Sequence, residues 1–465
     1  MMRDMKLEDW TKDATPIRFV DKESCQGALA AAGGLAAGFA AASAYKGAPG
    51  AALLVPAADG ALAAVLFGLE PESAEARDPF LPGKLASLLP PGLYRFEDGP
   101  ADAGAGALAF LLSSYKFTRY TSPKAQTPRL CAPEGVDRAR IERIAAAVAF
   151  GRDLVNTPAN DMGPEALAEA ALALAARHGA QARTVVGDAL LAENFPLIHA
   201  VGRAAAEAPR LVDFTHGPED GLKVTLVGKG VCFDTGGLDI KPSSAMLLMK
   251  KDMGGAAAAL ALADMLMDAA LPVRLRVIVP VVENSVSAAA FRASDVYRSR
   301  KGLTVEIGNT DAEGRLILAD ALALASEDSP ELLFDFATLT GAARVALGPE
   351  IPPFYTGDDA LADAIAAQGR RSSDPVWRLP LWDAYDSGLD SKIADVSSTT
   401  SHGFAGSITA ALFLRRFVAA PSRWAHFDLY AWNGAAKPGR SEGGEVQVAR
   451  LLYDLIEARA LGRSA

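Results

Sequence analysis

From residue 224 onward, strand-like and helix-like segments alternate along the chain. Short apolar runs predict strands at 224–227, 275–282, 304–307 and 332–337. Apolar residues that recur at helical spacing predict helices between them, at 256–269 and 316–325. This alternation is typical of a doubly wound, mostly parallel sheet with helices on both faces. Sheets of this kind bind their ligands at the carboxyl ends of the strands.

The length of the chain predicts two domains, because 465 residues exceed what one ordinary core accommodates. Residues 1–118 are interpreted as a small α/β domain. Residues 119–136 contain three prolines and few large apolar side chains, which is the composition of a linker. The larger domain is then expected to cover residues 137–465.

Four strands are expected within the small domain. Two of them flank the dipeptide Asp59-Gly60, which favours a tight hairpin turn. The four predicted segments are 51–55, 62–67, 94–96 and 108–112. The uncharged stretch 27–45 consists mostly of Ala and Gly with few large apolar side chains. We therefore expect it to form a helix of the folded domain and not a membrane span.

The charge and the cysteine content exclude several classes of protein. A net charge of −10 argues against general binding to nucleic acids or to acidic membranes. Three widely spaced cysteines fit a reducing compartment, and the charged N-terminal segment lacks the apolar core of a signal peptide. A cytoplasmic protein is therefore expected. Only five histidines occur, so a metal site in this chain must consist mainly of carboxylates.

The octet Asn309-Thr310-Asp311-Ala312-Glu313-Gly314-Arg315-Leu316 connects a predicted strand to a predicted helix. In an extended chain, Asp311 and Glu313 would share one face, and Arg315 would join them. Two adjacent carboxylates repel each other unless a proton or a cation lies between them. Considered alone, such a pattern favours a solvated turn with an internal salt bridge, because such pairs are common on protein surfaces.

A second group of charged residues favours the cation. Lys229 and Asp234 follow the predicted strand 224–227, and Asp252 precedes the Ala-rich helix. The segments VGKGVCFDTGG, DIKPS, MKKDMGGAA and NTDAEGRL occur in this order. Together they resemble the leucyl aminopeptidases, which are the cytosol aminopeptidases of the M17 peptidase family. The resemblance covers residues 145–465.

The resemblance implies a fold, an activity and a metal centre. Members of this family have an N-terminal domain of macro-domain type, form hexamers and remove N-terminal residues, leucine-like in preference, from peptides. A homo-hexamer acting on peptides is therefore expected here. The resemblance implies that two divalent ions, Zn²⁺ or Mn²⁺, are held by Lys229, Asp234, Asp252, Asp311 and Glu313. One ion would be held by the first three and Glu313, and the other by Asp234, Asp311 and Glu313.

The other functional roles also follow from the resemblance. Bound metals would activate a water molecule as the nucleophile. Lys241 would stabilise the oxyanion, and Arg315 would hold a bicarbonate ion that serves as the general base. The residues implied to bind substrate are Met249, Asn309, Ala312, Leu339 and Gly341. Salt bridges to the carboxylates are the alternative role of Lys241 and Arg315, and core packing is that of Met249 and Leu339.

Two segments depart from the family pattern. Residues 396–404 replace a usual Gly-rich loop with bulkier, more polar residues, which leaves the substrate preference open; His402 within it is expected at the surface. Residues 431–446 also differ.

Three alternatives remain: a dipeptidase acting on Cys-Gly or another dipeptide, a DNA-binding protein like some relatives, and a structural protein without activity. The acidic balance argues against the second, and the intact set of ligand positions argues against the third.

Overall fold

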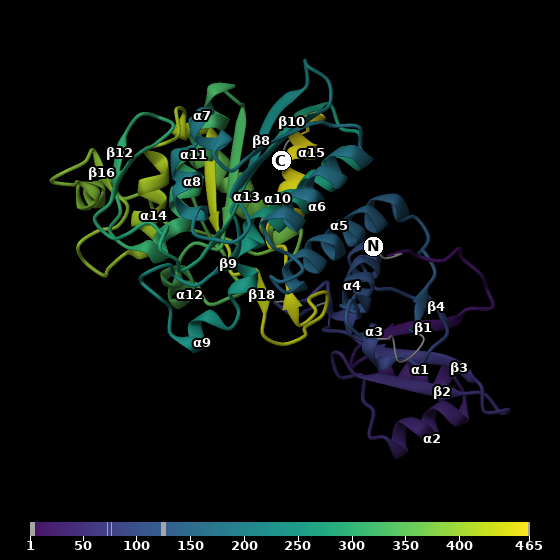
Figure 1. Ribbon diagram of the computed structural model, residues 1–465. Helices are drawn as coiled ribbons and strands as arrows, with labels where there is room; N and C mark the ends of the chain where they lie inside the picture. The colour runs from purple at the N-terminus through teal and green to yellow at the C-terminus, as the bar shows by residue number, and fades with distance from the viewer. Residues whose placement is uncertain (1–4, 72, 76, 122–126, 464–465) are drawn as a thin grey trace. The chain divides into compact units, whose positions relative to one another are not determined.

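A computed structural model describes residues 5–71, 73–75, 77–121 and 127–463. The chain folds into two compact units (Figure 1). The first unit comprises Met1–Ala149 and Gly434–Glu442, and the second comprises Phe150–Asn433 and Gly443–Ala465. The expected small α/β domain and the expected larger domain with a parallel sheet are both present.

The first unit contains a five-stranded sheet with the order β2-β3-β1-β4-β5. Its strands are β1 (Thr15–Val20), β2 (Ala52–Pro56), β3 (Leu62–Gly68), β4 (Leu93–Glu97) and β5 (Arg129–Leu130). Strands β2 and β3 form the predicted antiparallel hairpin, and β1 lies parallel to both β3 and β4. Strand β5 falls within the segment that was predicted as a linker, and it pairs with β4.

One strand prediction in this unit is wrong. Residues 108–112 belong to the helix α4 (Ala103–Ser114), which begins where the Asp102 side chain accepts a hydrogen bond from the Ala105 amide. Its apolar run is buried, and a short buried run does not distinguish a helix from a strand by its periodicity. The Ala-rich stretch forms two helices, α1 (Cys25–Ala31) and α2 (Gly34–Ala42). Among the described residues, no helix combines the length and the apolar character that crossing a bilayer requires.

The second unit contains a nine-stranded sheet with a parallel centre. The order is β15-β14-β17-β13-β8-β10-β7-β6, and β9 pairs with β10 beside this path. Strands β10, β8, β13 and β17 are parallel neighbours. The β7–β10, β6–β7 and β14–β17 pairings are antiparallel, and the edge strand β15 lies parallel to β14. The strands are β6 (Gln181–Val186), β7 (Arg210–His216), β8 (Leu222–Gly228), β9 (Gly230–Asp234), β10 (Val273–Asn284), β13 (Leu332–Ala337), β14 (Pro353–Thr356), β15 (Trp377–Arg378) and β17 (Trp424–Asp428).

Helices cover both faces of this sheet, as predicted (Figure 1). One group contains α6 (Pro164–Arg177), α10 (Gly254–Asp268) and α15 (Ala449–Ala460). The other contains α8 (Pro196–Gly202), α11 (Glu313–Glu327) and α14 (Gly406–Arg415). Helix α10 is buried from Gly254 to Met267, because its Ala-rich sequence allows β8 and β13 to pack closely against it. The remaining helices are α3 (Leu85–Leu88), α5 (Arg138–Asn156), α7 (Ala189–Ala192), α9 (Ser243–Met246), α12 (Gly341–Leu347) and α13 (Asp359–Arg371).

The predicted strand 304–307 exists as β12 (Thr304–Glu306), but it is not a strand of the large sheet. It lies between β11 (Val296–Arg298) and β16 (Val396–Ser397) in a separate three-stranded sheet. An apolar run predicts a strand without indicating its partners, so the sequence could not show this. The octet 309–316 therefore leaves a small sheet and enters α11. A further two-stranded ladder joins β18 (Trp432–Asn433) to β19 (Gly443–Gly444).

Candidate metal centre

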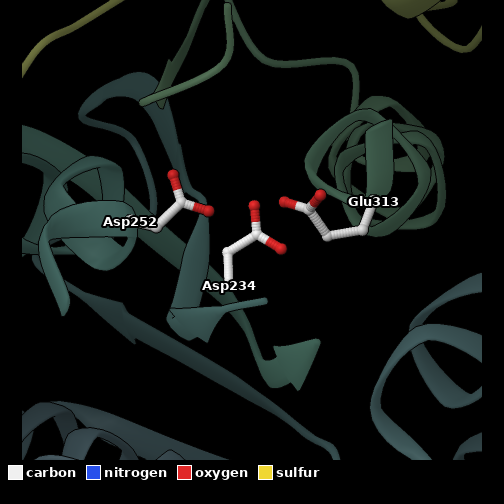
Figure 2. A group of neighbouring side chains, drawn as sticks. All are labelled: Asp234, Asp252 and Glu313. Carbon is white, nitrogen blue, oxygen red and sulfur yellow. The ribbon is translucent and has the colours of Figure 1, made fainter. Parts of the chain in front are cut away.

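Three carboxylates converge at the carboxyl end of the parallel strands (Figure 2). Asp234 is the last residue of β9, Asp252 lies in the short 3₁₀ helix that precedes α10, and Glu313 is the first residue of α11. Each offers one oxygen atom, and these atoms lie within 4.8 Å of one another. All three side chains are buried. A group of buried carboxylates of this kind needs a positive partner to be stable.

Lys229, which directly follows β8, provides part of that positive charge. Its Nζ lies 2.8 Å from Oδ2 of Asp252 and 3.0 Å from Oε1 of Glu313, and it donates a hydrogen bond of 2.8 Å to the carbonyl of Thr338. Burial lowers the pKa of Lys229, but the adjacent carboxylates outweigh burial and hold this pKa above its ordinary value. Lys229 is thus an ammonium group in the absence of a metal.

The carboxylates retain capacity for a cation. Although Lys229 is close to both, Asp252 Oδ2 and Glu313 Oε1 accept no well-aligned hydrogen bond from the described part of the chain. Burial and the neighbouring carboxylates raise the pKa of Asp234 well above its usual range. Burial likewise raises the pKa of Glu313. Oxygen atoms with free lone pairs and mutual repulsion fit a site for divalent cations.

Lys241 connects Asp234 to the fourth predicted carboxylate, Asp311. Its Nζ lies 2.8 Å from Asp234 Oδ2 and also contacts Asp311 Oδ1. Asp311 lies outside the group of three and its side chain is one-third exposed. Asn284, at the end of β10, donates a hydrogen bond of 2.8 Å to Asp234 Oδ1 and holds this carboxylate in place. Asn284 could not be identified from the sequence, because its position at a strand end is visible only once the sheet is known.

The octet does not have the extended conformation on which the spacing argument relied. Asn309 is extended and its side chain accepts a hydrogen bond of 2.7 Å from the Asp311 amide. A turn of 3₁₀ helix then covers Thr310–Ala312, and α11 begins at Glu313, three residues before the predicted start. Asp311 and Glu313 therefore reach the centre through a capped helix start, and not by sharing the face of a strand.

Arg315 is buried in the first turn of α11. It donates a hydrogen bond of 2.7 Å to the carbonyl of Ser398, whereas its Nε finds no acceptor among the described residues. Burial lowers the pKa of Arg315 to about 10, which still leaves it charged at neutral pH. A buried, charged N–H without an acceptor fits a site for an anion.

A single cavity of about 420 Å³ contains all the residues that the sequence analysis singled out. These are Lys229, Asp234, Lys241, Met249, Asp252, Asn309, Asp311, Ala312, Glu313, Arg315, Leu339 and Gly341. His402 is exposed, as expected. The cavity wall also includes residues to which no role had been assigned, among them Lys251, Arg344 and Tyr430. Lys251 stands within the segment MKKDMGGAA, and Tyr430 follows β17, so both could have been found from motif position and strand ends.

Comparison with known proteins places this arrangement in a family. Residues 149–453 match the cytosol aminopeptidase family, catalytic domain, and residues 15–133 match the M17 aminopeptidase, N-terminal domain. The chain belongs to the cytosol aminopeptidase family. It is therefore a metal-dependent aminopeptidase, a hydrolase of peptide bonds.

Individual relatives agree with the family assignment. The chain is 42% identical over 365 residues to a probable cytosol aminopeptidase of Syntrophotalea carbinolica, which covers 75% of this chain and 73% of that protein. The crystal structure of the cytosol aminopeptidase of Coxiella burnetii has a TM-score of 0.94 and 42% identity, covering 98% of this chain and 100% of that one. The bottromycin maturation enzyme BotP in complex with Mn has a TM-score of 0.86 and 35% identity, covering 96% and 99%.

Proposed function

We propose that this aminopeptidase uses two divalent cations held in the cavity and prefers leucine-like N-terminal residues. The observation that supports the proposal is the buried group of Asp234, Asp252 and Glu313, whose oxygen atoms lie within 4.8 Å of one another. Two-metal hydrolases bind their cations through shared carboxylates of this kind.

Five residues would hold the two cations. Lys229, Asp234, Asp252 and Glu313 would hold one of them, with Lys229 as the nitrogen donor, and Asp234, Asp311 and Glu313 would hold the other. Bound cations acidify a water molecule and polarise the scissile carbonyl. The metal is proposed to be Mn²⁺ or Zn²⁺, since oxygen-rich sites accept both, and one structural relative contains Mn.

Two cationic side chains of the cavity act on the reacting groups. Lys241 would stabilise the negative charge that develops on the carbonyl oxygen of the substrate. Arg315 would hold a bicarbonate ion through its Nε, which finds no acceptor among the described residues. The bicarbonate ion would supply a basic oxygen to the cleft. Arg315 itself is too basic to take up a proton. The salt bridges that Lys241 makes to Asp234 and Asp311 would be exchanged for contacts with substrate.

The remaining proposals concern the substrate and the assembly. Met249 would contact the first side chain of the peptide, and Asn309, Ala312, Leu339 and Gly341 would shape the cleft. We propose that the enzyme is a cytoplasmic homo-hexamer that acts on peptides. From the sequence we propose an N-terminal domain at 1–118, a linker at 119–136 and a catalytic domain at 137–465. The matches to the family's N-terminal and catalytic domains cover 15–133 and 149–453.

Metal analysis combined with a leucine p-nitroanilide assay tests the central proposal. We expect two equivalents of metal per chain, loss of activity on complete chelation, and recovery on addition of Mn²⁺ or Zn²⁺. Full activity after removal of metal, verified by elemental analysis, would contradict it. Activity that requires only one equivalent would overturn the two-metal assignment and leave the peptidase assignment intact.

A further inference from the structure

The ring of Tyr430, in the wall of the cavity, is contacted by two cationic side chains. The Nζ of Lys251 is 4.7 Å from the centre of the Tyr430 ring, and the guanidinium carbon of Arg344 is 5.2 Å from it. Arg344 also approaches the tyrosine hydroxyl, with 3.4 Å between its Nη1 and the oxygen. The three residues come from distant segments: Lys251 precedes α10, Arg344 lies in α12 and Tyr430 follows β17.

Neither cation forms an ion pair with a carboxylate in the part of the chain that the structure describes. Lys251 is only 6% exposed, yet its Nζ makes no hydrogen bond and no ion pair within the described ranges. Arg344 likewise has no carboxylate within ion-pair distance in that part of the chain. A buried ammonium normally has a charged or hydrogen-bonding partner, and the tyrosine ring satisfies it only in part.

The acidic groups near this pair are already engaged. Asp252 accepts a hydrogen bond of 2.7 Å from Thr338 and pairs with Lys229. Asp428 accepts hydrogen bonds from the amides of Leu339 and Thr340 and from the Thr340 hydroxyl. Two like charges beside one ring repel each other, so an anion bound by both would relieve the repulsion.

The cavity is lined by the carboxylates Asp234, Asp252 and Glu313 and also by the cations Lys251 and Arg344 beside Tyr430. A ligand that contacts both sets carries an amine and an anionic group a short distance apart. Small peptides have this distribution of charge.

We propose that Lys251 and Arg344 bind a carboxylate of the substrate, so that the enzyme favours short peptides bearing one close to the scissile bond. This inference rests on the proposed aminopeptidase function. The carboxylate has two possible sources, which share the same chemistry: the C-terminus of a dipeptide and the acidic side chain of a first residue. Charge-assisted hydrogen bonds recognise either one.

Paired substrates separate the two sources. Leu-Gly is compared with Leu-Gly-amide, which lacks the terminal carboxylate, and Glu-Gly-amide is compared with Gln-Gly-amide, which lacks the acidic side chain. The wild type is tested beside Lys251→Met and Arg344→Met, which remove the charge at similar length. Lys223→Met, an exposed residue at the beginning of β8, is the matched control. The bound metal is quantified for each protein.

For one of the two pairs, we expect the wild type to have a higher kcat/KM for the substrate with the carboxylate than for its neutral partner. The ratio of these two kcat/KM values should fall about 10- to 100-fold in both variants, chiefly because KM for the carboxylate substrate rises. Lys223→Met should keep the wild-type ratio. Ratios that are the same in wild type and variants would overturn the inference and leave the aminopeptidase intact. Absence of hydrolysis of all four substrates by the metal-loaded wild type would instead overturn the proposed function. If Lys251→Met lost metal, the substrate ratios of Arg344→Met alone would test whether the pair binds the carboxylate.

Discussion

A Cβ atom on Gly314 would lie 2.5 Å from Cε of Lys229. The absence of a side chain at this position of α11 therefore provides the space in which the lysine reaches Asp252 and Glu313. Lys229 is buried and bonded to the carbonyl of Thr338, so it has little freedom to move aside. The glycine of the octet thus serves close packing, and not a turn of the backbone.

Substituting Gly314→Ala is expected to lower kcat/KM about 100-fold. The added methyl group would push Lys229 away from the carboxylates, and a displacement of about 1 Å can cost this much. The helix itself should tolerate alanine, which is a better helix former than glycine. The matched control is Gly38→Ala in α2, where an added Cβ meets no atom within 4 Å. Steady-state kinetics and the circular dichroism spectrum check both variants; unchanged kinetics for Gly314→Ala would refute the packing argument.

Replacing Glu313 by Gln is expected to lower the affinity for metal by more than about tenfold and to abolish turnover. The reason is that the proposed site loses a negative charge shared by both cations, and even outer-sphere losses cost about 10- to 100-fold. Titration with Mn²⁺ followed by calorimetry measures the effect. Glu327→Gln, at the other end of the same helix, is the control and should bind metal normally.

Lys241→Ala and Arg315→Ala are expected to reduce kcat much more than they reduce metal content. Removing one group that stabilises an oxyanion lowers kcat about 10²- to 10³-fold. Elemental analysis and kinetics on the same preparations provide the comparison. Loss of metal in parallel with activity would show that these residues maintain the carboxylates and do not act on the substrate.

Asp320 predicts a pH dependence of stability that is independent of the site. It is buried in α11, where it accepts hydrogen bonds of 2.8 Å from the amides of Leu197 and Arg300, and burial raises its pKa to about 7. Between its ordinary pKa and this value, the folded chain retains a proton that the unfolded chain has released. Stability should therefore fall as pH rises through this window.

The comparison protein is Asp320→Asn, which does not titrate. The free energy of unfolding of wild type relative to this variant should decrease by up to about 4 kcal/mol between pH 4 and pH 7. Urea unfolding at several pH values measures the difference. A difference that stays constant, or that rises with pH, would show that the amides hold Asp320 ionised.

Much of the fold could be predicted from local sequence, and the cavity from the family resemblance. Strands such as β8 and β13 and the Ala-rich α10 have clear periodicities, and the resemblance carried by the ordered motifs implied twelve residues that line one cavity. The prediction was wrong for 108–112, because a buried apolar run suits a helix and a strand equally. It was also wrong about the extended octet and about the sheet that contains β12. The grouping of Lys251, Arg344 and Tyr430 depends on tertiary structure alone.

The pairing of β12 with β16 has a consequence for how this enzyme can change. Beside that small sheet, Ser398 is bound to the residue before the octet and to a residue within it: its hydroxyl accepts a hydrogen bond from the Gly308 amide, and its carbonyl accepts one from Arg315. A segment that departs from the family pattern is thus hydrogen-bonded to the octet. A substitution in this loop that moves the Ser398 carbonyl would therefore also move Arg315, so the conformation of the loop and the position of the arginine are coupled.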